Sequence, residues 1–80
     1  MINPFFRNVS FIKANAVQFL TQLGYHNVGY EGSDAGLLVG GYCWYQAVSD
    51  SCPNAVFTMK LRKQGDSLKL VFDRVITPTC

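Results

Sequence analysis

Apolar residues recur with a helical period in the first third of the chain. Five of them fall on one face at 3.6 residues per turn, namely Ile12, Ala16, Phe19, Leu20 and Leu23. Ser10 can act as the N-cap, and Gly24 stands where a left-handed residue ends a helix. The pattern predicts a helix over residues 11–23, preceded by an irregular lead-in over residues 1–9.

Beyond this helix the hydrophobic period changes to two, which is typical of strands. The predicted strands cover residues 25–30, 37–48, 55–63 and 67–76. Turn-forming residues fill the predicted loops over residues 31–36 and 49–54. The pair Gly40 and Gly41 lies inside the second strand and indicates a bulge, a bend or a close backbone approach.

The last two strands are expected to form a hairpin. A two-residue loop at Gly65 and Asp66 keeps apolar residues opposite apolar residues, and so does a four-residue loop over residues 63–66. With the two-residue loop, the expected pairs are Leu61 with Leu70, Met59 with Phe72, Arg62 with Lys69, and Lys60 with Val71. The predicted fold class is α+β: one N-terminal helix packed on a three- or four-stranded antiparallel β-meander.

Composition supports one small domain over residues 1–80. The chain is 49% hydrophobic and only 15% charged, which excludes a disordered tail and a coiled coil. Its net charge of +2 is too small to predict a polyanionic partner by itself. No apolar run is long enough for a membrane span, and residues 1–7 do not read as a signal peptide. A cytoplasmic protein is predicted, with a periplasmic or secreted one as the alternative if a leader was removed.

Three cysteines, Cys43, Cys52 and Cys80, are spaced neither as a zinc site nor as a redox motif. Three reduced thiols are expected, with Cys43 buried in its strand; a Cys43–Cys52 disulfide is the alternative. His26 is the only histidine, so a thiol enzyme that pairs it with a cysteine is the least favoured hypothesis. No phosphate-loop motif or metal-ligand spacing occurs. We therefore expect no catalytic residue, no metal and no cofactor.

Five of the seven basic residues lie between residues 60 and 74. They form either a solvated outer sheet face that discourages edge pairing or a docking face for an acidic protein or a nucleic-acid backbone. If the aromatic residues of the second strand share that face, the result is an aromatic and cationic platform; if they face the helix, they are core. The candidate binding face comprises Lys60, Arg62, Lys69, Arg74, Tyr42 and Trp44.

Short motifs resemble a group of small bacterial and prophage proteins, some of them lipoprotein-like. The motifs are ANAVQFL at residues 14–20, GY at 24–25, VGYEG at 28–32 and GGYCWY at 40–45. A basic turn follows at residues 60–66, with Gln64 where the group has tryptophan. The resemblance implies the order of helix and strands and carries no activity.

The leading functional hypothesis is a non-enzymatic binding or accessory module of bacterial or mobile-element origin that acts on a protein partner. Nucleic-acid binding by the basic hairpin is the second hypothesis, and an envelope-associated protein whose leader was removed is the third. Low charge, an open sheet and the pair Phe5 and Phe6 also predict a homodimer through a sheet edge or face.

Overall fold

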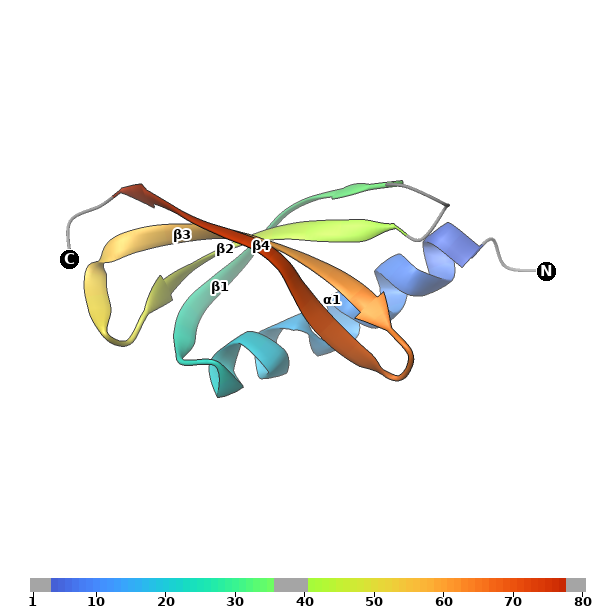
Figure 1. The fold of residues 1–80 in the computed structure, drawn as a ribbon, viewed down its shortest axis with the longest axis horizontal. Coiled ribbons are helices and arrows are strands. Elements are labelled where there is room, and N and C mark those ends of the chain that lie inside the picture. The colour runs from blue at the N-terminus through green and yellow to red at the C-terminus, as the bar shows by residue number, and fades with distance from the viewer. Residues whose placement is uncertain (1–3, 36–40, 78–80) are drawn as a thin grey trace.

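The computed structural model describes residues 4–35 and 41–77, in which one helix crosses one face of a four-stranded antiparallel sheet (Figure 1). The elements are α1 (Pro4–Gln22), β1 (Tyr25–Asp34), β2 (Tyr42–Ser49), β3 (Cys52–Gln64) and β4 (Ser67–Thr77). The strands lie in sequence order, so each one pairs with its neighbour along the chain. The predicted α+β fold is confirmed, with four strands in the meander.

The hydrophobic core lies between α1 and the sheet. Ile12, Ala16 and Leu20 are fully buried, which confirms the predicted helix face. They pack against inward side chains of three strands: Cys43, Tyr45, Ala47, Met59, Leu61 and Leu68. Leu23 is 50% exposed because α1 ends before it, so its predicted place on the buried face is wrong.

The helix begins earlier than the sequence predicts. It starts at Pro4, so residues 4–9 are helical and Ser10 lies inside α1, where it cannot act as an N-cap. Proline suits the first helical position because it has no amide hydrogen to leave unbonded. Val9 extends the core-facing side by one turn and packs against the core. Among the described residues, no helix is long and apolar enough to cross a membrane.

Gly24 ends the helix as predicted. Its φ of +94° is left-handed, and its amide donates to the Thr21 carbonyl at 3.1 Å. The strands that follow are longer than expected. β1 runs through residues 31–34, and the connection from β2 to β3 is the two-residue turn Asp50–Ser51 in place of a six-residue loop. Polar side chains indicate exposure to solvent and do not exclude a strand, because these exposed segments still pair through backbone hydrogen bonds.

Residues 37–40 of the predicted second strand lie outside the described residues, and Gly40 of the expected glycine bulge is one of them. Gly41 has a φ of +73° and comes immediately before β2. Register shifts do occur in β1, between His26 and Gly29 and between Tyr30 and Gly32. Irregular pairing in this part of the sheet is therefore carried by the edge strand.

The hairpin of β3 and β4 has the predicted two-residue loop. Gln64 pairs with Ser67, and Gly65 has a φ of +62°, as a type II′ turn needs at its first central position. The predicted pairs of Leu61 with Leu70 and Arg62 with Lys69 are confirmed.

A β-bulge then changes the register. Lys60 pairs with Phe72 and Met59 with Asp73, so the predicted pairs Met59–Phe72 and Lys60–Val71 are wrong. The physical reason is the extra residue Val71, which shifts the rest of β4 by one position. Because side chains alternate along a strand, this shift moves Phe72 from the helix side to the opposite side.

Candidate functional site

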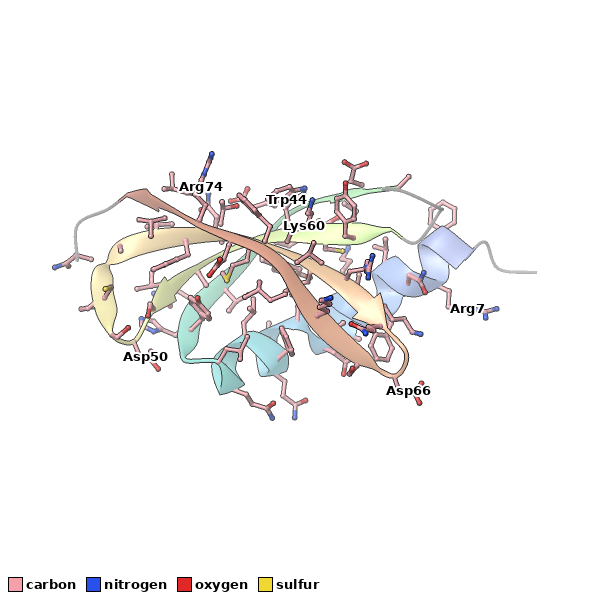
Figure 2. All side chains as sticks on the ribbon, in the orientation of Figure 1. Arg7, Trp44, Asp50, Lys60, Asp66 and Arg74 are labelled. Atoms are coloured by element: carbon pink, nitrogen blue, oxygen red, sulfur yellow. The ribbon has the colours of Figure 1, made fainter. Side chains whose placement is uncertain are left out.

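The sheet face opposite α1 carries all six residues of the predicted binding face. On β2, Cys43, Tyr45 and Ala47 are buried, so the alternating side chains of Tyr42 and Trp44 point away from the helix. Figure 2 shows Trp44, Lys60 and Arg74 on this side of the sheet. We call it the outer face and define it by Tyr42, Trp44, Lys60, Arg62, Lys69, Phe72 and Arg74.

Lys60 lies between two aromatic rings on the outer face. Its Nζ is 4.4 Å from the centroid of the Tyr42 ring and 5.2 Å from that of the Trp44 ring. Both distances are within the range of cation–π attraction. Lys60 reaches both rings because it pairs directly with Trp44 across the strands, and Tyr42 stands two residues along β2. The ammonium group and the two rings therefore form one connected cluster.

Phe72 completes this cluster from β4. Its ring meets the Trp44 ring edge-to-face, with centroids 5.8 Å apart and planes at 72°. Phe72 is nevertheless 41% exposed, and Trp44 and Tyr42 are half-buried. The hydrophobic pattern assigned Phe72 to the helix side, because nothing in that pattern marks the bulge at Val71. It is the outer-face residue that sequence reasoning missed.

A hollow of 150 Å³ opens beside this cluster. It is lined by Gly41, Tyr42, Lys60, Arg62 and Val71. One aromatic ring and two cationic side chains thus border the same depression. Its walls suit a flat or apolar group that carries a negative charge nearby.

The outer face is more positively charged than the net charge of the whole chain indicates. Four cations lie on it, whereas the complete sequence sums to only +2. Asp34 stands at its margin, opposite Tyr42, while Asp50 and Asp66 lie at turns away from it (Figure 2). Lys63 belongs to the helix side, where its Nζ is 5.2 Å from the centroid of the Phe11 ring.

The cysteines differ from both sequence predictions. Cys43 is a free, buried thiol, and Cys52 is disulfide-bonded, so neither a Cys43–Cys52 bridge nor three reduced thiols is present. Cys52 pairs with Ser49, six residues along β2 from Cys43, which corresponds to about 20 Å. A disulfide needs Cα atoms within about 7 Å, so these two cannot reach each other. Cys80 lies outside the described residues.

Cys43 behaves as a core residue. Burial raises the pKa of its thiol, and a hydrogen bond with Ser33 and the nearby charge of Lys13 only partly oppose that effect. The Cys43 Sγ lies 3.4 Å from the Ser33 Oγ. A thiolate is the reactive form, so this environment makes Cys43 a slow nucleophile.

Thiol labelling should separate the two cysteines. In the native protein Cys43 is expected to react slowly with an alkylating reagent, and after unfolding without reductant it should react fully. Cys52 should react only after reduction, because its sulfur is held in a disulfide. Peptide mass spectrometry of the labelled protein would check this, and alkylation of Cys52 in unfolded, non-reduced protein would contradict the prediction.

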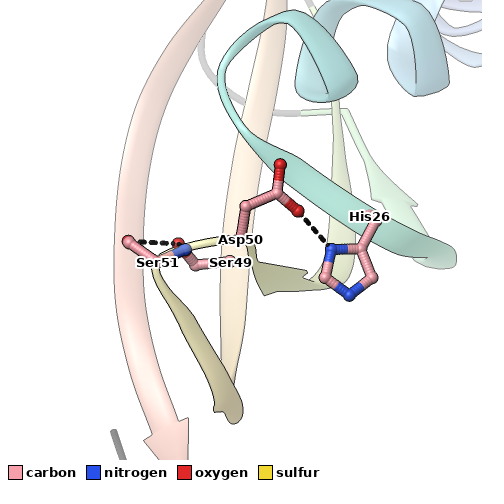
Figure 3. Close-up of polar contacts among 4 residues, drawn as sticks. All are labelled: His26, Ser49, Asp50 and Ser51. Carbon is pink, nitrogen blue, oxygen red and sulfur yellow. Dashed lines mark hydrogen bonds and ion pairs between the residues drawn. The ribbon is translucent and has the colours of Figure 1, made fainter.

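His26 lies next to a carboxylate at the end of the sheet (Figure 3). Its Nδ1 is 2.6 Å from the Asp50 Oδ1, and the Asp50 amide donates to the Gly24 carbonyl at 2.8 Å. Ser49 and Ser51 share a hydrogen bond of 2.9 Å between their hydroxyl groups. The two contacts of Asp50 fasten the β2–β3 turn to the junction of α1 and β1. Among the described residues, no cluster of histidine, cysteine or acidic side chains could hold a metal ion.

A second hollow, of 220 Å³, lies on the helix side between α1 and the β3–β4 turn. Its lining is Phe11, Asn15, Gln18, Phe19, Gln22, Asp66, Ser67 and Leu68. The Asn15 amide already donates to the Phe11 carbonyl at 2.8 Å, so part of its polar lining is satisfied within α1. None of the described residues that line it is cationic, unlike those of the hollow on the outer face.

No protein-family model, curated protein sequence or solved structure matches this chain. The resemblance to small bacterial and prophage proteins, and the homodimer, therefore stay predictions. The geometry of the outer face is what bears on function.

Proposed function

We propose that this chain is a non-enzymatic binding module that docks an anionic partner on the outer face of its sheet. The observation that supports this proposal is the shared position of four cations and three aromatic rings on the side that α1 leaves open. Acidic proteins and polynucleotides both have the required charge. The origin from bacteria or their mobile elements belongs to the same proposal and rests on the resemblance of the motifs.

A solvated face that only discourages edge pairing would not need this arrangement. Lysine and arginine alone serve that purpose, and they tolerate water better than aromatic rings do. The core is already closed by inward residues of β2, β3 and β4 against α1. Rings that are left beside cations on the other side of the sheet are typical of binding surfaces, where aromatic residues and arginine are enriched.

The disulfide at Cys52 supports an oxidising compartment for this module. Disulfides persist in the periplasm and outside cells and are rare in the cytosol, where thiols are kept reduced. We therefore propose the periplasmic or secreted location in place of the cytoplasmic one.

Binding to heparin tests the use of the outer face for anions. Lys69→Ala removes a cation from the outer face, and its matched control Lys63→Ala removes a cation of the same hairpin from the helix side. We expect Lys69→Ala to weaken heparin binding about threefold to tenfold at about 50 mM salt and to flatten the salt dependence, because one ionic contact is lost. Lys63→Ala should change affinity less than twofold. Equal losses would show that net charge alone decides binding and would overturn the proposal.

A further inference from the structure

We propose that the anionic partner is single-stranded nucleic acid, whose bases stack on the rings of the outer face. This inference rests on the proposed function and names its ligand. Tyr42 and Trp44 stand two residues apart on the same side of β2, which separates them by about 7 Å. Duplex bases lie only about 3.4 Å apart and cover one another's faces. Only unstacked bases, as in a single strand, can lie on two rings with this separation.

Each of the two rings of β2 has a cation opposite it on β3. Arg62 pairs with Tyr42 across the strands, and Lys60 pairs with Trp44. Each ring thus has one cation beside it on the same face, which matches the alternation of base and phosphate along a polynucleotide. Lys69 pairs with Arg62 from β4 and extends the cationic track beyond the rings. Aromatic platforms flanked by a basic track are the recurrent means of binding single strands.

In the free protein, Lys60 holds the rings of Tyr42 and Trp44 in position. Its Nζ lies 4.4 Å and 5.2 Å from the centroids of Tyr42 and Trp44, so it attracts both rings in the absence of ligand. An incoming base would take the place of the ammonium group over a ring, and the ammonium group would then neutralise the adjacent phosphate. The edge-to-face contact with Phe72 helps to fix the position of the Trp44 ring before the ligand arrives.

An acidic protein segment would contact the cations of the outer face but not its rings. Carboxylates need the cations but have no flat apolar group to stack on Tyr42 and Trp44. A polynucleotide alternates both groups at a regular interval, as the face does. The observations therefore favour the nucleic acid.

The ligand is tested with a fluorescein-labelled oligothymidylate of about 12 nucleotides, a length that covers one small binding module. The sequence holds a single tryptophan, so quenching of Trp44 fluorescence reports stacking directly. We expect quenching by the oligonucleotide and not by heparin. We also expect the oligonucleotide to bind at least tenfold more tightly than a duplex of equal length.

Substitutions separate stacking from charge. Trp44→Leu should weaken oligonucleotide binding about fivefold to 150-fold, because stacking contributes about 1–3 kcal/mol per base. Trp44→Phe should remain within about threefold of the original affinity, because it keeps a ring for stacking. The matched control is Tyr30→Leu, an exposed aromatic residue on the helix side, where the Lys13 Nζ lies 4.5 Å from its ring centroid. It should leave oligonucleotide binding unchanged, and thermal unfolding would verify that each variant is folded.

Two results would overturn this inference in different ways. If heparin binds through Lys69 but Trp44→Leu binds the oligonucleotide as well as the original chain does, the outer face binds anions without stacking. The nucleic-acid ligand is then wrong and the proposed function stands. If neither heparin nor the oligonucleotide binds at about 50 mM salt, both proposals fail.

Discussion

Replacement of Leu20 by alanine is expected to lower the free energy of unfolding by about 2–5 kcal/mol. Leu20 is 0% exposed and packs in the cluster that joins α1 to β2, β3 and β4. Alanine would leave a cavity there, because the sheet opposite is held by its own hydrogen bonds and cannot collapse onto the shortened side chain. In a domain of this size that loss is a large share of the total stability.

Urea denaturation would measure the effect, with the slope of the transition showing whether the unfolded state also changes. Gln18→Ala is the matched control, since Gln18 lies exposed in the same helix. It should change the free energy of unfolding by less than about 0.5 kcal/mol. Equal losses from the two variants would mean that the buried face of α1 is assigned incorrectly.

Alkaline pH is expected to destabilise the protein through Tyr45. Burial raises the pKa of Tyr45 to about 12, and the neighbouring Cys43 thiol and Tyr30 hydroxyl add to the increase. In the unfolded chain the phenol ionises near pH 10, so there the unfolded state loses its proton first. Stability is complete below pH 10 and falls as the pH rises toward the folded value. Over that interval the loss amounts to about 2–3 kcal/mol at most.

Urea unfolding at several values between about pH 8 and pH 11 would reveal this fall. Tyr45→Phe removes the titrating group and should flatten most of the decline. A smaller slope should remain, because burial and the charge of Asp73 also raise the pKa of Tyr25. An unchanged decline in Tyr45→Phe would show that other groups control alkaline unfolding.

The sequence predicts best where one periodicity repeats without interruption. Ile12, Ala16 and Leu20 are spaced regularly enough to identify the buried side of the helix, and Gly65 marks the hairpin turn by its backbone freedom. The pattern places the start of α1 too late. Phe6, in the first turn, is 61% exposed, so burial imposes no regular spacing of apolar residues there. Local patterns end where the burial that produces them ends.

Six residues of the candidate site could be predicted from the sequence, but not that the aromatic and the basic ones lie on the same face. Lys60, Arg62 and Lys69 share a side by simple alternation, which the hairpin makes predictable. Arg74 reaches that side only through the bulge at Val71. The side taken by Tyr42 and Trp44 depends on how β2 connects to β3. The two-residue turn Asp50–Ser51 fixes that register, and the polar sequence around it predicted a longer loop. The position of Phe72 could not be predicted either, because the bulge that sets it arises from the pairing of β3 with β4.

The bulge at Val71 makes the outer face of β4 independent of one residue of chain length. A chain without Val71 would still pair Phe72 with Lys60, because the pairing that begins at the turn would then run on without interruption, and Phe72 would keep its place on the outer face. A chain that kept Val71 but paired without the bulge would return Phe72 to the helix side and turn Asp73 onto the outer face. The pairing between the strands, and not the number of residues, therefore decides which side chain stands beside Trp44.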